Sequence, residues 1–420
     1  MIEKAKEMEK IPEGWKRVKF GEVIIENKKS PFKVEDADNE GYYPFFTSGD
    51  SVLSHSKFLV DGENIFMSTG GTAYVNFYCG KASYSADTYS FKSKINSRLL
   101  YYSIYRKLNY ITFRFFIGSG LEHLQKPDFK NKFEIIFPKE NDEQRKIAEI
   151  LETVDNAIEK SDRLIEKYKR IKQGLMQDLL TKGIDENGQI RNELTHKFKD
   201  SPLGRIPEEW EVKRLGEVGS IIMGQSPPSL LINQEGKGIP FLQGNAEFGV
   251  KFPKPIYYIE QPLKVAPPNS ILISVRAPVG DLNLNCKYYY CIGRGLACLK
   301  PYDESLTFIW HTLSFYISKL NLLSQGSTFE AIGKKELEYF SIPFPPLHEQ
   351  QRIASILSQI DETIEKETAY KEKLMKLKSG LMEDLLTGKV RVNKLINEES
   401  EANELIKYSV NEEIHSSKEI

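Results

Sequence analysis

The chain has 420 residues, 40% of them hydrophobic and 28% charged, with a formal net charge of −1. This length predicts two or three domains, and the near-zero charge excludes a uniformly basic nucleic-acid binder, so any basic surface has to be local. The sequence contains no run of about 18 apolar residues and does not open on an apolar signal segment, so we expect a cytoplasmic protein that does not contact membranes. Its four cysteines include no Cys-x₂-Cys pair, and we expect no metal site.

Residues 11–140 predict a first globular domain, which opens with "IPEGWKRVKFGEV". Short β-like runs follow, among them "NIFMSTGG" (64–71) and "YSADTYSFK" (84–92). "SRLLYYSIYRKL" (97–108) has the spacing of an amphipathic helix. Mixed strands and helices of this kind indicate an α+β domain.

Residues 141–182 predict one long helix, which begins just after a proline-terminated strand. Apolar residues recur along it at alternating spacings of three and four, which is a heptad stripe of the coiled-coil type. At 1.5 Å per residue such a helix is roughly 60 Å long. Residues 183–205 are polar, contain Gly and Pro, and predict a linker.

The second half repeats this order. Residues 206–346 open with "IPEEWEVKRLGEV" and predict a second globular domain, with strands in "SILISVRAPVG" (270–280) and "GRGLACLKP" (293–301). Residues 347–392 predict a second long helix, whose "HEQQRIASILSQIDETIEK" matches "DEQRKIAEILETVDNAIEK" of the first. The remaining residues, 393–420, are polar, and we expect them to be disordered.

The duplication predicts how the elements pair. Two homologous halves tend to pack about a pseudo-twofold axis, and such an axis makes the two long helices antiparallel. We therefore expect an α+β protein with an internal repeat. Its two globular domains would be separated by two long, antiparallel, coiled-coil-like helices.

Catalytic signatures are missing from the sequence. There is no phosphate-binding P-loop, no Asn/Asp-Pro-Pro-aromatic tetrapeptide of adenine methyltransferases and no His-Glu-x-x-His pair. "PDFK" (127–130) opens like a nuclease motif but lacks the acid-x-Lys that should follow. We expect a protein that is not an enzyme and binds no cofactor of its own.

Several segments carry a family resemblance. "FPPLHEQQRIASILSQID", followed by "LKSGLMEDLLTGKVRV", resembles the specificity subunit of type I restriction-modification enzymes, and a degenerate copy lies in mid-chain. "GEVGSIIMGQSPP", "ISVRAPVG" and "QGSTFEAI" are similar to the second target-recognition domain of that family. The first half departs from it, with "FMSTGGTAY" in place of "LISVRAPVG" and "GSGLEHL" in place of "GSTFEAI".

The resemblance implies a non-catalytic subunit that binds double-stranded DNA at an asymmetric bipartite site, with one half-site for each globular domain. It implies two modification subunits, which bind S-adenosylmethionine, and restriction subunits as partners. ATP and Mg are expected on those partners, and the assembled complex would be an adenine DNA methyltransferase and ATP-dependent endonuclease. The alternative is a free-standing DNA-binding repressor or architectural protein built on a coiled coil.

Candidate DNA contacts in the first domain are of two kinds. Hydroxyl groups on Gly-rich turns could reach bases, and basic side chains could reach phosphates. The hydroxyl candidates are Ser48, Ser68, Thr69 and Thr72, and the phosphate candidates are Lys57, Lys81, Arg114 and Lys126. Any single one of these basic residues is more often solvated surface than a contact.

In the second domain, amides on loops suit the N6/N7 edge of adenine, and Arg suits O6 and N7 of guanine. The candidates are Gln225, Gln243, Asn245, Arg276, Arg294, Ser327 and Thr328. Two alternatives stay open: the amides could cap turns, and Arg276 could pair with Asp281 on the surface.

Other repeated residues are interpreted as structural. Trp15 and Trp210 open the two halves, and we expect both to anchor a core. The repeated helix charges, Glu143 with Lys160 and Glu349 with Lys366, predict a mostly solvated helix face that could contact the modification subunits.

Overall fold

The computed structural model describes residues 11–398 with the exception of 39, 304 and 325–330. It divides into two compact units, Met1–Asp162 with Ala369–Ile420, and Arg163–Thr368. Each unit therefore contains one globular domain, part of helix α4 (Asn141–Leu179) and part of helix α8 (Leu347–Leu385). Within the described residues, no helix is long and apolar enough to cross a membrane.

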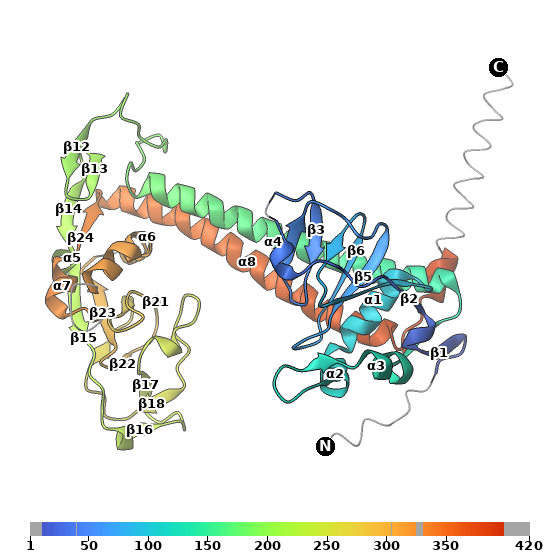
Figure 1. The fold of residues 1–420 in the computed structure, drawn as a ribbon. Coiled ribbons are helices and arrows are strands. Elements are labelled where there is room, and N and C mark those ends of the chain that lie inside the picture. Colours follow the sequence, from blue (N-terminus) through green and yellow to red (C-terminus); the bar gives the residue numbers. More distant parts are fainter. Residues whose placement is uncertain (1–10, 39, 304, 325–330, 399–420) are drawn as a thin grey trace. The chain divides into compact units, whose positions relative to one another are not determined.

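The first domain is built on a four-stranded antiparallel sheet in the order β2-β8-β5-β6, with a three-stranded sheet β4-β3-β7 beside it (Figure 1). A two-stranded sheet, β1-β11, leads to the long helix. The strands are β1 Trp15–Lys19, β2 Ile24–Glu26, β3 Tyr43–Phe46, β4 Val52–His55, β5 Glu63–Ser68, β6 Val75–Cys79, β7 Ser83–Tyr84, β8 Thr88–Ser93, β9 Phe116–Ile117, β10 His123–Leu124 and β11 Glu134–Pro138. The helices are α1 Ser97–Arg106, α2 Leu108–Phe115 and α3 Lys126–Lys132.

The second domain has the same plan. Its four-stranded sheet runs β15-β23-β20-β21, its second sheet β16-β18-β17-β22-β19, and β14-β24 leads to α8. The strands are β14 Glu211–Arg214, β15 Gly219–Met223, β16 Ile232–Asn233, β17 Ile239–Leu242, β18 Tyr257–Ile259, β19 Val265–Ala266, β20 Ser270–Ser274, β21 Leu282–Asn285, β22 Tyr290–Ile292, β23 Leu296–Pro301 and β24 Ser341–Phe344. The helices are α5 Leu215–Val218, α6 Leu306–Ser324 and α7 Lys334–Tyr339. The linker contains a hairpin, β12 Phe198–Ser201 with β13 Gly204–Pro207.

The strand registers define equivalent residues in the two domains. The central strand β5 pairs Ser68 with Thr88, and its counterpart β20 pairs Ser274 with Leu296. Each domain also has one parallel pair, β3 with β7 and β17 with β22. Both domains thus share a topology, and a position in one can be compared with its counterpart in the other.

The long helices share a core with the globular domains. In the first unit, Ile147 and Leu151 of α4 and Leu385 of α8 belong to the same buried cluster as the first domain. In the second unit, Ile353 and Leu357 of α8 pack with the second domain in the same way. Burial of these apolar stripes is the main term that holds helix and domain together in each unit.

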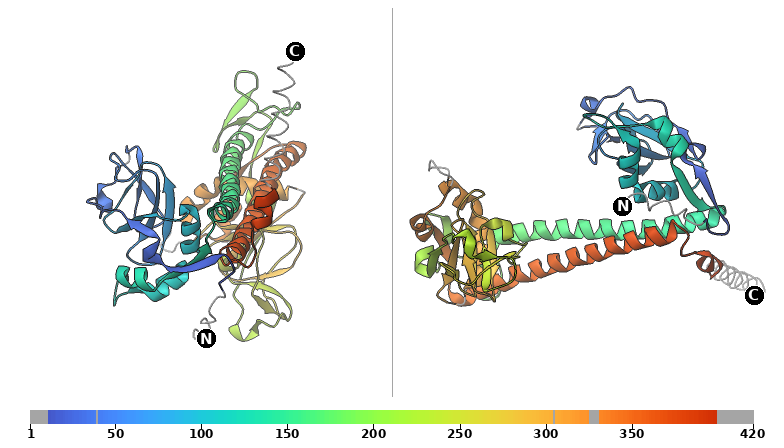
Figure 2. Two further views of the ribbon diagram at one scale, coloured as in Figure 1. Left: turned by 90° about the vertical axis from the view of Figure 1, so that its right-hand side faces the viewer. Right: turned by 90° about the horizontal axis from the view of Figure 1, so that it is seen from below.

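Within the first unit, α4 and α8 run antiparallel. Asp155 pairs with Lys378 at 2.6 Å, and Asp162 pairs with Lys371 at 2.5 Å. From the first pair to the second, the position moves seven residues forward in α4 and seven residues back in α8, so the two helices run in opposite directions. Figures 1 and 2 show these first-unit segments of α4 and α8 side by side.

The predicted disordered tail is described only over residues 393–398, which are helical and not disordered. Ile396 packs against the first core, and this contact explains the order. The rest of the tail lies outside the described residues.

Candidate nucleic-acid interface

In the second domain, four loops meet at one edge, at the carboxyl ends of β15, β17, β20 and β22. The backbone N–H of Gly293 donates to the Leu242 carbonyl at 2.8 Å, and that of Val275 donates to the Gly295 carbonyl at 2.9 Å. Gln225 joins the same group through its N–H, which donates to Ile292. We call residues 224–226, 243–245, 275–281 and 293–295 the second loop edge.

This edge gathers five of the sequence candidates. Their positions are Gln225 after β15, Gln243 and Asn245 after β17, Arg276 after β20 and Arg294 between β22 and β23. All but Asn245 are exposed. The remaining candidates of this domain, Ser327 and Thr328, lie outside the described residues.

The two arginines stand on fixed backbone. The N–H of Arg294 donates to the Ser226 hydroxyl at 3.2 Å, and Arg276 forms a β-bridge with Ala331. The proposed partner of Arg276, Asp281, instead accepts a hydrogen bond from the Asn245 amide at 2.7 Å. Among the described residues the structure shows no ion pair between Arg276 and Asp281; the carboxylate is hydrogen-bonded to Asn245.

The first domain has a corresponding edge. The hydroxyls of Ser48 and Thr69 both donate to the Asp87 carbonyl, and the distance from the Thr69 hydroxyl to that oxygen is 2.7 Å. The hairpin β9–β10 closes the edge, since the N–H of Gly71 donates to the Glu122 carbonyl at 2.9 Å. We call residues 47–51, 69–72, 85–87 and 118–123 the first loop edge.

Two of the first-domain hydroxyl candidates differ in role. The Ser68 side chain is buried, donates to the Thr72 carbonyl at 2.7 Å and accepts from the N–H of Tyr74 at 2.8 Å. Its hydrogen bonds therefore close the turn. The Thr72 side chain is exposed on that turn.

The basic candidates do not all lie at the first loop edge. Val52 of β4 and Tyr84 of β7 are the strand ends that reach the first loop edge. Lys57 and Lys81 are exposed near the other ends of these strands, away from the edge. Lys81 stacks 4.8 Å over the Phe58 ring. Arg114 is exposed near the end of α2, just before the hairpin.

Lys126 is half-buried beyond the hairpin, 4.7 Å over the Tyr89 ring. Burial lowers its pKa from the ordinary lysine value, while the nearby Glu26 carboxylate raises it. An ammonium group in this position is less available to a phosphate than an exposed one.

Three residues of the first loop edge were missed by the sequence analysis. Asp87 and His123 are exposed there, and Leu121 remains 65% exposed although it is apolar. The Leu121 side chain reaches over Gly70: a Cβ placed on that glycine would lie 3.8 Å from Leu121 Cδ2. The sequence signal that could have drawn attention to it is the departure of "GSGLEHL" from "GSTFEAI" of the second half.

A second repeated site holds each domain to the long helices. Glu349, at the start of α8, is 2% exposed, and both carboxylate oxygens pair with the Arg191 guanidinium. The indole N–H of Trp210 donates to the same carboxylate at 3.0 Å. We call these three residues the second clamp.

The first clamp consists of Glu143, Arg391 and Trp15. The Arg391 guanidinium donates to both Glu143 oxygens, at 2.6 and 2.9 Å, and lies 6.0 Å from the Trp15 ring. Both tryptophans are buried, as predicted. The prediction that Glu143 and Glu349 are solvated is wrong, because an arginine distant in sequence covers each carboxylate; Lys160 and Lys366 are exposed.

Each clamp requires a glycine just beyond a helix. Gly183 follows α4 with φ +65°, and Gly388 follows α8 with φ +69°. A Cβ at Gly183 would lie 2.2 Å from Glu349 Oε1, and one at Gly388 would lie 2.6 Å from Pro12 Cγ. The left-handed conformation and the close approach both exclude a larger residue.

A third repeated contact lies along the helices. Asp155 accepts from the Tyr102 hydroxyl at 2.7 Å in addition to its pair with Lys378. Its counterpart Asp361 pairs with Lys172 at 2.6 Å and lies 4.0 Å from His311 Nδ1. Burial lowers the pKa of His311 to about 4, so this imidazole is neutral at pH 7.

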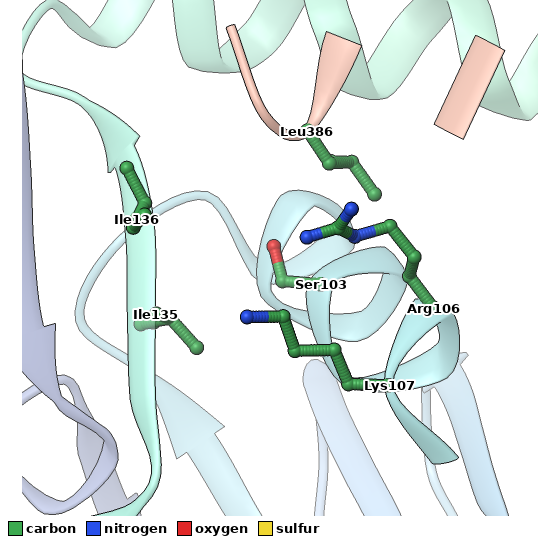
Figure 3. Close-up of a pocket in the computed structure, with 6 residues that line it drawn as sticks. All are labelled: Ser103, Arg106, Lys107, Ile135, Ile136 and Leu386. Atoms are coloured by element: carbon green, nitrogen blue, oxygen red, sulfur yellow. The ribbon is translucent and has the colours of Figure 1, made fainter. Parts of the chain in front are cut away.

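A small cavity lies in the first unit. Figure 3 shows it, lined by Ser103, Arg106, Lys107, Ile135, Ile136 and Leu386. Ser103 donates to Leu99 within its own helix, and Arg106 pairs with Glu383 at 2.7 Å. In the part of the chain that the structure describes, no cluster of His, Cys, Asp or Glu could hold a metal. Cys291 and Cys298 are buried, whereas Cys286 is exposed beyond β21.

Comparison with known proteins gives a consistent result. The family model "Type I restriction modification DNA specificity domain" matches residues 12–167 and again 207–376. A protein of Methanocaldococcus jannaschii provisionally named the MjaX type I restriction enzyme specificity subunit is 48% identical over 256 residues, which are 60% of this chain and 58% of that protein. The MjaVIII specificity subunit of the same organism is 30% identical over 422 residues, 92% of this chain and 95% of that protein.

A solved structure has the same fold. The S subunit of a type I restriction-modification system from M. genitalium aligns with a TM-score of 0.66 at 17% identity, over 90% of this chain and 97% of that one. The two matches to the family model coincide with the two halves of the internal repeat. The chain therefore belongs to the specificity subunits of type I restriction-modification systems, the non-catalytic DNA-recognition subunits that the sequence resemblance predicted.

Proposed function

We propose that each globular domain binds one half of an asymmetric, bipartite duplex site through its loop edge. The observation that supports this most is the convergence at one edge of Gln225, Gln243, Arg276 and Arg294, which come from four separate loops. Exposed amide and guanidinium groups on a fixed backbone suit the donors and acceptors of base edges in the major groove. The first loop edge offers hydroxyl, carboxylate and backbone groups at equivalent positions.

The two long helices set the distance between the half-sites. In this proposal they pack over their whole length as an antiparallel, coiled-coil-like pair about a pseudo-twofold axis. Recurrence of the Asp155–Lys378 pair as Asp361–Lys172 supports this arrangement. Half-sites on the same face of the duplex are about 34 Å or one helical turn apart, a span that such a helix can bridge.

The repeat also accounts for the partners. Two equivalent surfaces suit two copies of one modification subunit, and exposed Lys160 and Lys366 are equivalent positions at which these copies could dock. S-adenosylmethionine would lie on the modification subunits, and ATP and Mg on restriction subunits. The complex would act in the cytoplasm. Family membership leaves the alternative of a free-standing repressor without support.

The test is the methylome of cells that express this chain with its modification subunit. We expect methylated adenines in one asymmetric motif of two specified parts, separated by a fixed number of unspecified base pairs. Purified chain alone with S-adenosylmethionine should transfer no methyl group. A single continuous motif, or methylation by the chain alone, would contradict the proposal.

The spacer role has its own test. Four residues inserted after Ser161 lengthen α4 by about 6 Å and by about one turn, so the apolar stripe stays near register. We expect the unspecified spacer to grow by one or two base pairs while both half-sites stay the same. Full methylation with an unchanged spacer would show that the helices do not set the distance.

A further inference from the structure

The turn after the central strand occupies the same place in both domains. Ser68 and Ser274 end strands β5 and β20 in matching registers, so Gly70 in the first domain corresponds to Arg276 in the second. Both residues also form an isolated antiparallel bridge, Gly70 with His123 and Arg276 with Ala331. The two domains therefore place different chemistry at one equivalent point of their loop edges.

In the second domain this point is cationic. The Arg276 side chain is exposed. The preceding residue is held by two hydrogen bonds: the Val275 N–H donates to the Gly295 carbonyl at 2.9 Å, and the Val275 carbonyl accepts from the Ile332 N–H at 3.0 Å. Arg276 itself forms the bridge with Ala331. A fixed backbone lowers the entropy lost when the guanidinium is aligned with a base. A planar fork of donors matches the O6 and N7 acceptors of guanine.

In the first domain the same point has no side chain of its own. Two side chains of the hairpin lie over Gly70: His123 Nδ1 is 3.6 Å and Leu121 Cδ2 is 3.8 Å from the position of a glycine Cβ, so Leu121 is the apolar group at this point. The hairpin is held there by the Gly71–Glu122 hydrogen bond and by the Leu124 N–H, which donates to Thr69 at 3.0 Å. A leucine that is 65% exposed at a DNA-facing edge can contact the C5-methyl group of thymine, the apolar feature of the major groove.

We propose that Arg276 specifies a guanine in the second half-site and that Leu121, seated on Gly70, specifies a thymine in the first. The inference rests on the proposed function, because it needs each loop edge to face one half-site. It adds the base identity at two positions and assigns a role to a residue outside the predicted set.

The test uses the wild-type chain in its complex with the modification subunits, and duplexes that carry the motif found by methylome sequencing. Replacing each second-half-site guanine in turn by 7-deazaguanine removes the N7 acceptor. One such replacement should weaken binding about tenfold, the loss of part of a bidentate contact. Replacing each first-half-site thymine by deoxyuridine removes one methyl group and should weaken binding about fourfold at one position.

Variants assign these effects to the two residues. In R276A, 7-deazaguanine should no longer weaken binding, whereas deoxyuridine should still do so. In L121A, deoxyuridine should no longer weaken binding, whereas 7-deazaguanine should still do so. R205A and L194A, in the linker, are matched controls and should behave as wild type; the Arg205 side chain is about half exposed, and Leu194 is 95% exposed.

Two results would overturn the inference: a motif without guanine in the second half-site or thymine in the first, or wild-type binding that is insensitive to both base analogues. In either case the bipartite motif itself would still stand, so the proposed function would survive. Absence of any bipartite motif would instead contradict the proposed function.

Discussion

The two units are alike where they are buried and unlike where they face solvent. Each has a clamp of Glu, Arg and Trp and an Asp–Lys pair along the helices. At the loop edges, by contrast, the position of Arg276 in the second unit corresponds to that of Gly70, covered by the hairpin, in the first. Substituting one buried member of a clamp leaves its charged or polar partners buried without a hydrogen-bond partner, which lowers stability. Exposed loop residues can be substituted with little loss of stability. This difference lets specificity vary on a fixed framework.

The clamps themselves are not identical. Arg191 is 10% exposed and Arg391 is 31% exposed. Glu349 accepts from the Trp210 indole, whereas the Trp15 indole nitrogen is buried without a hydrogen-bond partner among the described residues. The second clamp is thus more desolvated and more fully bonded, so the same substitution should cost more there.

The largest expected effect is that of E349Q. Loss of the carboxylate charge leaves Arg191 buried without its counter-ion, which typically costs about 3–5 kcal/mol. E143Q should cost less, because Arg391 is more exposed to water. The measurement is the free energy of unfolding in urea for both variants. E362Q, which disrupts an exposed pair with Lys366, is the control and should cost less than about 1 kcal/mol. Equal losses for E349Q and E143Q would show that the two clamps are equivalent.

A pH effect of similar size should be confined to the second unit. His311 has a pKa of about 4 in the folded chain and about 6.5 when unfolded. Between these values only the unfolded chain binds the proton, so stability falls as the pH drops from about 6.5 to 4, by about 3 kcal/mol. Burial is the main cause; Asp361 opposes the shift, and Lys172 and Lys251 add to it.

The measurement is the unfolding free energy at pH 7 and pH 4.5 for wild type and H311Q. The difference between the two proteins isolates this group from the carboxylates that titrate in the same range. We expect H311Q to lose less stability on acidification. An identical loss in both proteins would show that His311 is protonated in the folded chain.

The smallest effect separates the two tryptophans. W210F removes the indole donor from Glu349 and leaves a small void, so it should cost about 2–3 kcal/mol. W15F leaves a similar void but breaks no hydrogen bond that the structure shows, and should cost about 1 kcal/mol less. Urea unfolding of the two variants checks the order. A larger loss for W15F would mean that its indole nitrogen has a partner.

The repeated elements could be predicted from the sequence because they depend on local patterns. Heptad spacing and the preceding prolines indicated α4 and α8, and the repeated Trp15 and Trp210 indicated core anchors. The burial of Glu143 and Glu349 could not be predicted in this way. Each belongs to a charged helix face, and its arginine lies 248 or 158 residues away in the chain.

The loop edges show the same limit. Gln225, Arg276 and Arg294 were found because their residue types suit base edges. Leu121 was missed because an exposed leucine in a Gly-rich hairpin has no distinctive local pattern. Backbone contacts of residues 69–71 with residues 122–124, far apart in the sequence, bring that hairpin to the turn after β5. Lys57 and Lys81 were predicted as phosphate contacts by residue type, although the strand directions carry them away from the loop edge.

The central claim is that each domain specifies one half-site independently on a shared framework. Its most direct test is to exchange residues 206–340 for the second recognition domain of another family member and to sequence the methylome with the same modification subunit. The account predicts a motif in which the second half-site is new, while the first half-site and the spacer length are unchanged. A change in both half-sites, or in neither, would contradict it.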